Sequence, residues 1–326
     1  MTQIVITVDT ELSAGRQARG LAARANYESS YLGRCAAGDF GVPWLMDRLE
    51  AHGLKGLFFV DPMPALVHGD GLVADMVGPI LARGHEVQLH AHVEWLAFAA
   101  TPPLAPRGRD LARFPPAEQA RLIACARALL IAAGAPPPTA FRAGNFGAND
   151  DTLRALGQLG LLWDMSANPA YAGRGCGIAG AADRVRPWRA HGVTEIPVSA
   201  FVDRPGRVRP AQVCAITADE MARALDHALA AGDGVFSVVT HSFEMLSRDR
   251  ARPNRMVMAR FEALCRAAAA RGTRFSGLAA LDPIALAAGG ADPARLRARP
   301  WRTAWRHAEQ ALATLRYERR LWPARG

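Results

Sequence analysis

The sequence predicts an α/β protein whose strands form a closed or distorted barrel. Stretches with strand character alternate some seven times with helical stretches of ten or more residues. Such alternation is typical of parallel strands joined by helical crossovers. No glycine-rich phosphate-binding sequence follows the first strand, which favours a barrel over a dinucleotide-binding fold. With 326 residues, 50% of them hydrophobic, the chain is long enough for one barrel with additions.

Proline and glycine mark the ends of the elements expected in the first half of the chain. Pro43 suits the first turn of a helix, and Gly53 and Gly84 suit positions just after helices. The expected elements are a strand over 3–8, a helix over 43–52, a strand over 54–60, a helix over 72–83 and a strand over 85–89.

The second half continues the alternation around one irregular stretch. Residues 167–193 are rich in glycine, and we expect a long excursion there over one face of the barrel. The expected elements are a helix over 116–133, strands over 139–143 and 161–165 flanking a helix over 151–159, a strand over 195–201, a helix over 218–231, a strand over 235–241, a helix over 256–271 and a last strand at 273–275.

Two acids directly follow the first expected strand, at Asp9 and Glu11, and His90, His92 and Glu94 follow a later one. Because the carboxyl ends of parallel strands meet at one face of a barrel, we expect these side chains to converge. Carboxylate oxygens and neutral imidazole nitrogens are zinc-type ligands, and a catalytic zinc site keeps one position open for water. The pattern indicates a metal-dependent hydrolase.

The spacing leaves open which residues of the second cluster share a face. In an extended backbone His90 and His92 point the same way, whereas in a helix His90 and Glu94 do. Asp9 has a plainer interpretation as the cap of a turn, and a lone histidine is usually structural. The density of such residues at two strand ends favours the metal site.

Arg142 and His241 end two further expected strands. Arg142 precedes a glycine turn, where it is either a surface residue or the partner of a carboxylate such as Asp9 in the barrel mouth. An imidazole at position 241 can act as an acid or a base near neutral pH.

Taken together, these residues resemble the polysaccharide deacetylase family (NodB-homology domains, carbohydrate esterase family 4), with this chain as a divergent member. The resemblance spans roughly residues 1–285 and rests on five ordered motifs. The first, second, third and fifth motifs fall at Asp9-Thr10-Glu11, at His90, at Arg142-Ala143-Gly144 and at His241. The fourth motif, which lines the substrate groove in the family, is loosely represented by Trp163-Asp164. It implies a distorted (β/α)7-type barrel of the NodB-like glycoside hydrolase/deacetylase fold. Beyond it, from the composition, we expect a basic helical extension over 286–326.

The resemblance also implies the chemistry. Members hold a divalent metal, zinc first, with cobalt, manganese or iron as alternatives, and remove acetyl groups from N-acetylated sugars. Asp9 takes the position of the catalytic base, Arg142 holds it in place, and His241 takes the position of the general acid. Glu11 and His90 take metal-ligand positions.

This chain departs from the family at position 94, which is glutamate where members have a second metal-binding histidine. Either Glu94 or His92 replaces that histidine, or the site binds metal weakly and the protein is an inactive sugar-binding relative. A hydrolase of a non-sugar amide or a cyclic C–N bond on the same fold is a further alternative.

The net charge of +9 comes mostly from the end of the chain. Residues 290–326 contain nine arginines and three acids, so their net charge is 9 − 3 = +6. The same segment contains the aromatic residues Trp301, Trp305, Tyr317 and Trp322. This mixture suits weak peripheral association with an anionic membrane, and the alternative is a helix packed against the barrel. No recognised module supports nucleic-acid binding.

The cysteines suggest neither a disulfide framework nor a thiolate zinc site. They are odd in number, widely scattered and without a C-x-x-C pair: Cys35, Cys125, Cys176, Cys214 and Cys265. The first strand begins at residue 3, and no apolar run is long enough for a membrane span. From the sequence we expect a cytoplasmic protein.

Overall fold

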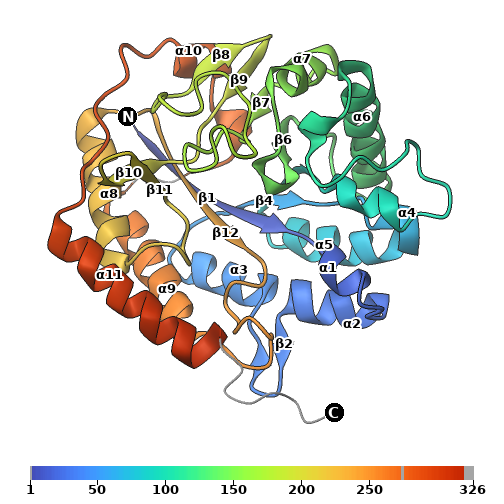
Figure 1. Ribbon diagram of the computed structural model, residues 1–326, viewed down its shortest axis with the longest axis horizontal. Coiled ribbons are helices and arrows are strands. Elements are labelled where there is room, and N and C mark those ends of the chain that lie inside the picture. Colours follow the sequence, from blue (N-terminus) through green and yellow to red (C-terminus); the bar gives the residue numbers. More distant parts are fainter. Residues whose placement is uncertain (1, 273–274, 319–326) are drawn as a thin grey trace.

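A computed structural model describes residues 2–272 and 275–318. Its centre is a curled sheet of eight strands in the order β12-β1-β4-β5-β6-β7-β9-β8 (Figure 1). All neighbouring strands run parallel except β8 and β9, which are antiparallel. The strands are β1 (Gln3–Thr10), β4 (Leu57–Val60), β5 (Glu86–Ala91), β6 (Ala140–Ala143), β7 (Trp163–Asp164), β8 (Trp188–Ala190), β9 (Val193–Glu195) and β12 (Val235–His241).

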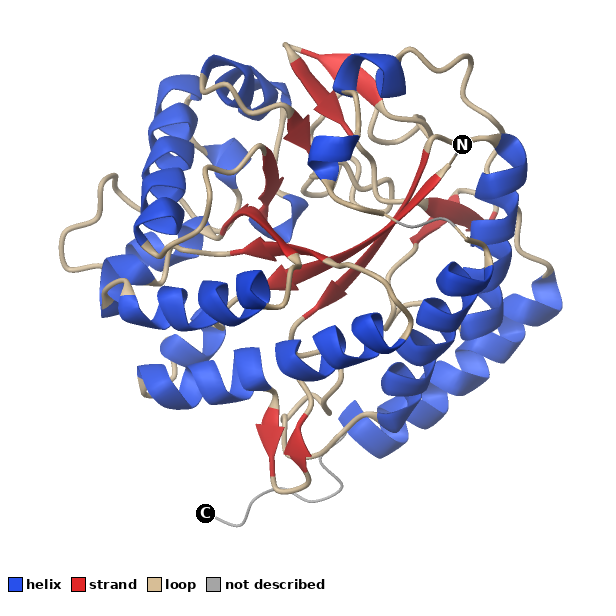
Figure 2. Cartoon of the chain, turned by 180° about the vertical axis from the view of Figure 1, so that it is seen from behind, coloured by secondary structure: helices blue, strands red, loops and turns tan. Residues whose placement is uncertain are grey.

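Helices surround this sheet on its outer face, as the view from behind shows (Figure 2). The longer ones are α3 (Val42–Ala51), α5 (Gly71–Ala82), α6 (Pro116–Ala132), α7 (Asp150–Gln158), α8 (Ala218–Ala231), α9 (Arg255–Ala270) and α11 (Pro300–Ala313). Shorter elements are α1 (Ala14–Gln17), α2 (Ala23–Tyr27), α4 (Ala65–His68), α10 (Pro283–Ala287) and the hairpins β2–β3 (Arg34–Cys35, Gly38–Asp39) and β10–β11 (Ala200–Arg204, Arg207–Pro210).

The barrel is distorted because no strand pairing joins β12 directly to β8 in the described sheet. Backbone segments outside the eight strands partly close the gap beside β12 instead. The Ser199 N–H donates to the Ser237 carbonyl over 3.0 Å, and the Val239 N–H donates to the Ala211 carbonyl over 3.0 Å. The predicted distorted barrel is therefore confirmed, with the seam placed next to β12.

Side chains alternate along the strands and divide the core in two. On β1, Ile4, Ile6 and Val8 pack toward the helices, whereas Val5 packs inside the barrel with residues such as Trp163. The inward positions that follow Val5 are Thr7 and Asp9, which are polar and buried. The barrel interior is thus apolar at one end and polar at the carboxyl ends of the strands.

The predicted elements are found with small shifts and two differences. The strand expected over 195–201 is interrupted at Pro197, which has no N–H for a sheet hydrogen bond, so β9 ends at Glu195 and β10 begins at Ala200. The excursion expected over 167–193 contains β8, an antiparallel edge strand. Residues 273 and 274 of the expected last strand lie outside the described residues.

The last long helix of the described residues, α11, packs against the barrel. On α11, the fully buried Arg306 forms ion pairs with Asp203 and, over 3.1 Å, with Glu220. Arg302 reaches Asp219 of α8, and Glu309 reaches Arg260 of α9. The boundary predicted at residue 285 remains a prediction. No helix in the described part of the chain is long and apolar enough to cross a membrane.

Candidate active site

The strand register brings the predicted catalytic residues together inside the mouth of the barrel. Asp9 on β1 lies opposite His241 on β12, and His90 on β5 lies opposite Arg142 on β6. Each is an inward position at the end of its strand, so the alternation that buries Val5 also directs Asp9 into the site. With Glu11, which follows β1, they enclose the predicted site.

Arg142 holds Asp9 in place. Its Nη1 donates to Asp9 Oδ1 over 2.5 Å and to Thr7 Oγ1 over 2.8 Å, while Nε donates to the Met165 carbonyl. The guanidinium also stacks on the ring of Phe59, 4.3 Å from its centroid. Burial raises the pKa of Asp9, but the positive charge of Arg142, with smaller effects of the two nearby histidines, outweighs it and lowers that pKa. Asp9 is therefore ionised and oriented at neutral pH.

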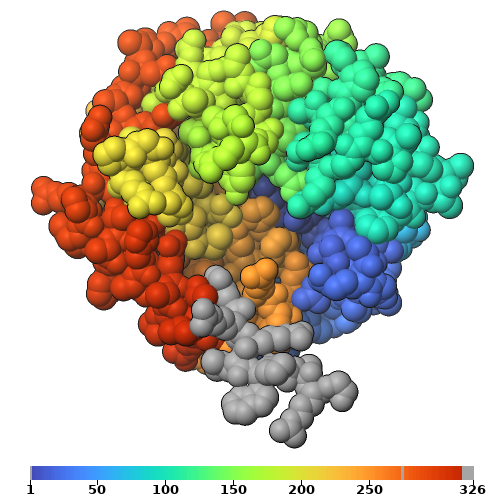
Figure 3. Space-filling model, viewed as in Figure 1, coloured from blue at the N-terminus to red at the C-terminus, as the bar shows by residue number. Residues whose placement is uncertain are grey.

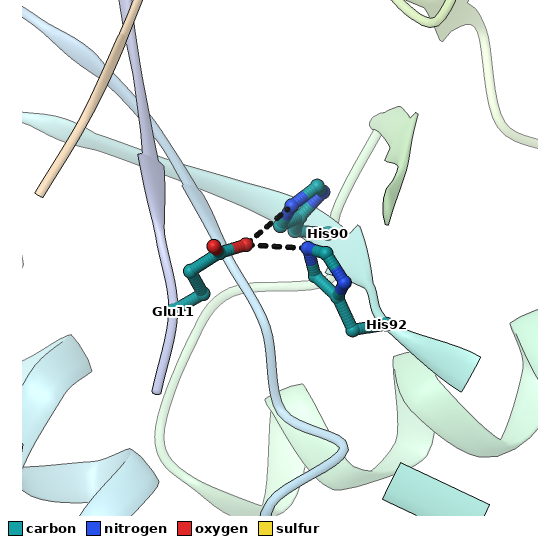
Figure 4. Close-up of side chains that lie close together, drawn as sticks. All are labelled: Glu11, His90 and His92. Atoms are coloured by element: carbon teal, nitrogen blue, oxygen red, sulfur yellow. Dashed lines mark ion pairs between the residues drawn. The ribbon is translucent and has the colours of Figure 1, made fainter. Parts of the chain in front are cut away.

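Glu11, His90 and His92 form a cluster with the chemistry of a metal site (Figure 4). Their ligand atoms lie within 4.8 Å of one another. Glu11 Oε2 lies 3.3 Å from His90 Nε2 and also contacts His92 Nε2. This oxygen is buried, yet it has no hydrogen bond of acceptable geometry. A buried carboxylate oxygen facing two imidazole nitrogens fits a divalent cation bound by one carboxylate and two histidines.

Hydrogen bonds at Nδ1 fix both imidazoles with Nε2 toward Glu11. His90 Nδ1 lies 2.7 Å from the Arg142 carbonyl, and His92 Nδ1 lies 3.2 Å from Glu94 Oε2. Because both partners only accept, each Nδ1 carries the proton, which leaves Nε2 to bind a metal. Glu94 thus lies behind His92, outside the cluster, and Asn145 Nδ2 donates to the same Glu94 oxygen over 3.0 Å.

The turn after β6 comes close to His92. A Cβ atom at Gly144 would lie 2.8 Å from both the His92 ring and the Ala91 carbonyl, so only glycine fits there. Asn145 and Phe146 then adopt left-handed backbone conformations, with φ of 58° and 56°. Such strained residues are maintained where the surrounding structure requires them. Here the turn brings Asn145 to Glu94 and Phe146 to the wall of the site.

Glu244 orients His241, a role that the amino-acid sequence did not indicate. His241 Nδ1 lies 2.7 Å from Glu244 Oε1, and His241 Nε2 lies 3.8 Å from Asp9 Oδ2. Thr240 and Gln212 donate to the same Glu244 carboxylate. Burial lowers the pKa of His241, but the hydrogen bond and charge of Glu244, with Asp9 and Glu11, outweigh it and raise that pKa to about 9. His241 is therefore protonated at neutral pH.

The site opens into a small cavity of about 160 Å³. Figure 3 shows this face hollowed between the N-terminal helices in blue, the segment after β12 in orange and the excursion after β7 in yellow-green. The rings of Phe146 and Tyr171, tilted by 35° with centroids 5.4 Å apart, line the cavity. Trp163 and Asp164 do not: Trp163 is buried in the barrel core, and Asp164 accepts from Ser166. The cavity is instead lined by two aromatic residues that the sequence did not single out.

Asp61 is a second residue that sequence reasoning missed. It follows β4 and is fully buried, where its Oδ1 accepts from the Met63 and His92 N–H groups over 3.0 and 3.3 Å. Burial raises the pKa of Asp61 to about 6, against the lowering effect of His92 and His90. Its position directly after the strand expected over 54–60 is the signal that could have identified it, because Asp9 and His90 also directly follow expected strands.

Two substitutions distinguish the roles of His92 and Glu94. His92→Ala is expected to remove zinc binding, because it deletes one of three ligands. Glu94→Gln is expected to weaken zinc affinity by about 10–100-fold, the usual effect of losing the hydrogen-bonding partner of a metal-bound histidine. Zinc titration of chelator-treated protein measures both. Loss of binding in Glu94→Gln, with binding kept in His92→Ala, would make Glu94 the ligand.

We find no family model that matches the chain and no curated protein that matches its sequence. Solved structures match its fold. A protein from Mycobacterium smegmatis, provisionally assigned as a polysaccharide deacetylase, has a TM-score of 0.56 at 18% identity over 91% of this chain and 93% of its own. Puue allantoinase has a TM-score of 0.52 at 14% identity over 84% of this chain and 86% of its own. The predicted barrel is thus shared with both structures, and the resemblance to polysaccharide deacetylases is confirmed at the level of the fold.

Proposed function

We propose that the protein is a metal-dependent hydrolase that removes the N-acetyl group from an N-acetylated sugar or glycan. The observation that supports this most strongly is the joint position of two groups of residues at one cavity. One group, Glu11, His90 and His92, fits a divalent cation, and zinc is the metal we propose. The other contains an ionised carboxylate at Asp9 and a protonated imidazole at His241.

The catalytic roles follow from the protonation states. When bound, the cation polarises the acetamide carbonyl and lowers the pKa of a water molecule. Asp9, held by Arg142, accepts the proton of the attacking water, and a carboxylate with a lowered pKa is free to do so at neutral pH. His241, protonated and oriented by Glu244, donates a proton to the leaving amine.

The pKa of His241 gives a testable pH dependence. Because the protonated imidazole is the active form, kcat/KM should fall as the pH rises through the pKa of His241, which is raised to about 9. Glu244→Gln removes the charge and weakens the hydrogen bond that raise this pKa, so the alkaline limb should move to lower pH. The pH profile of acetate release from both proteins measures this. An unchanged limb in Glu244→Gln would argue against His241 as the acid.

Acetate release tests the proposed reaction. Zinc-loaded protein should release acetate from N-acetylhexosamine oligomers, and chelator-treated protein should not until zinc or cobalt is restored. The similarity in fold to Puue allantoinase supports a second candidate, hydrolysis of a cyclic amide, which should be assayed in parallel. Activity on the cyclic amide alone would reject the deacetylase, and binding of the oligomer with neither activity would indicate an inactive relative.

We propose a cytoplasmic location, because all five cysteines are free thiols in the structure. We also propose that the C-terminal tail associates weakly with anionic membranes, as its composition predicts. No nucleic-acid partner is proposed.

A further inference from the structure

Helix α11 turns a polar face toward the barrel. Arg306 is fully buried between Asp203 and Glu220, and Thr303 Oγ1 donates to Asp203. One turn further along, Gln310 Nε2 donates to the Ala215 carbonyl over 3.1 Å. Ion pairs and hydrogen bonds, rather than an apolar stripe, therefore attach this helix to the molecule.

The outward face of the same segment is apolar. Trp301, Trp305, Leu312 and Leu315 are 58%, 61%, 55% and 51% exposed. Their spacing, with Ala308 completing the series 301, 305, 308, 312 and 315, places them on one side of the helix. At 1.5 Å per residue the stripe is about 21 Å long.

This arrangement is the reverse of an ordinary surface helix, which buries its apolar stripe and exposes its polar face. The other exposed large hydrophobic residues in the described part of the chain, Ile131, Leu162, Tyr171 and Ile284, do not belong to this stripe. A contiguous apolar stripe on an otherwise polar surface marks an interaction site.

We infer that the outward face of α11 docks onto an anionic lipid surface, with the helix lying in the plane of the interface. Arginines flank the stripe: Arg297 and Arg299 are exposed before its first residue, and Arg316 follows its last. The single acid of α11, Glu309, is engaged by Arg260 and by the Trp305 Nε1–H. Tryptophan and leucine on one side, with cations at the ends, suit a helix lying in a headgroup layer.

The same charges disfavour a second copy of the chain as the occupant of this face. Antiparallel pairing of two such stripes would bring Arg299 of one copy near Arg316 of the other, and parallel pairing would place identical arginines side by side. Like charges at close range oppose association, whereas anionic headgroups neutralise all of them.

Helix α11 lies along the edge of the molecular face onto which the candidate active site opens (Figures 1 and 3). In Figure 1 α11 is in front and in Figure 2 it is distant, and Figure 3 shows it in red along the edge of the hollowed face. The inference concerns location and does not depend on the proposed reaction.

Vesicle binding of the full chain tests the inference. Vesicles of mixed phosphatidylglycerol and phosphatidylcholine should bind the wild type, with a blue shift of tryptophan emission, and vesicles of phosphatidylcholine alone should bind it more weakly. The double variant Trp301→Ser/Trp305→Ser should bind the mixed vesicles at least about tenfold more weakly, because it removes most of the aromatic area of the face. Arg297→Gln/Arg299→Gln should lower the salt sensitivity of binding.

A matched control is Ile131→Ser/Leu162→Ser, which removes exposed apolar side chains elsewhere and should bind as the wild type does. Circular dichroism confirms that each variant is folded. Equal vesicle binding by the wild type and the tryptophan variant would overturn the inference, as would no binding by either. A wild-type dimer that the tryptophan substitutions dissociate, seen by analytical ultracentrifugation, would show that a second copy covers the face instead.

Discussion

Asp9→Asn is expected to lower the rate of hydrolysis by about 10²–10⁴-fold, the usual contribution of a general base, while the protein stays folded and keeps its metal. The amide oxygen can still accept the hydrogen bond that Arg142 Nη1 donates to Asp9 Oδ1. Arg142 also keeps its bonds to Thr7 and Met165. What the variant loses is a carboxylate that can take a proton.

Glu11→Ala is the matched comparison for this substitution, because it removes a predicted ligand from the neighbouring position. It should lose both metal and activity, whereas Asp9→Asn should lose activity alone. The measurements are acetate release and metal content of each purified protein. If Asp9→Asn lost the metal and Glu11→Ala kept it, the roles of the two acids would be reversed.

Arg306→Met is expected to lower the free energy of unfolding by about 3–5 kcal/mol, the typical effect of breaking a buried ion pair from one side. Glu220 would remain buried without the guanidinium that now pairs with it, and Asp203 would keep only Arg209 as a charged partner. The effect is expected although α11 lies far along the chain from the candidate active site, because this contact attaches the helix to the barrel.

Arg302→Met provides the control, since Arg302 pairs with Asp219, whose side chain is 52% exposed. Exposed pairs contribute about 0–1 kcal/mol, so this variant should unfold near the wild-type urea midpoint. Equal destabilisation by the two substitutions would show that burial of Arg306 does not determine the stability of this attachment. A folded, fully stable Arg306→Met protein would argue for a tail that is only loosely attached.

The fold was predictable where local signals agree with the tertiary structure. The helix at α8 and the strand at β12 match their expected bounds, because each combines a periodic apolar pattern with residues suited to its ends. The division of 195–201 into two strands was missed because the strand character of the segment was given more weight than Pro197. The edge strand β8 was missed because its pairing with β9 depends on a partner, and its glycine-rich surroundings predict a loop.

The candidate site was predictable in its main residues and not in their supports. Asp9, His90, Arg142 and His241 share a strand-end position, and the barrel brings such positions together. The role of Glu244 depends on its hydrogen bond to His241 Nδ1, which the spacing of residues along the sequence does not reveal.

The choice between His92 and Glu94 shows the same limit. The chain leaves β5 in an extended conformation, with φ and ψ of −97° and 101° at His92, and this turns the His92 ring toward Glu11 and leaves Glu94 behind it. Sequence spacing admits both a strand and a helix there, and only the structure selects one.

The central claim is that Glu11, His90 and His92 bind a divalent cation. The most direct measurement is the metal content of chelator-treated protein after equilibrium dialysis against zinc. The wild type should retain about one ion per chain, as a single catalytic site requires, and Glu11→Ala should retain only the background. The claim would be contradicted if the wild type retained only the background amount of metal after dialysis against zinc, against iron and against cobalt.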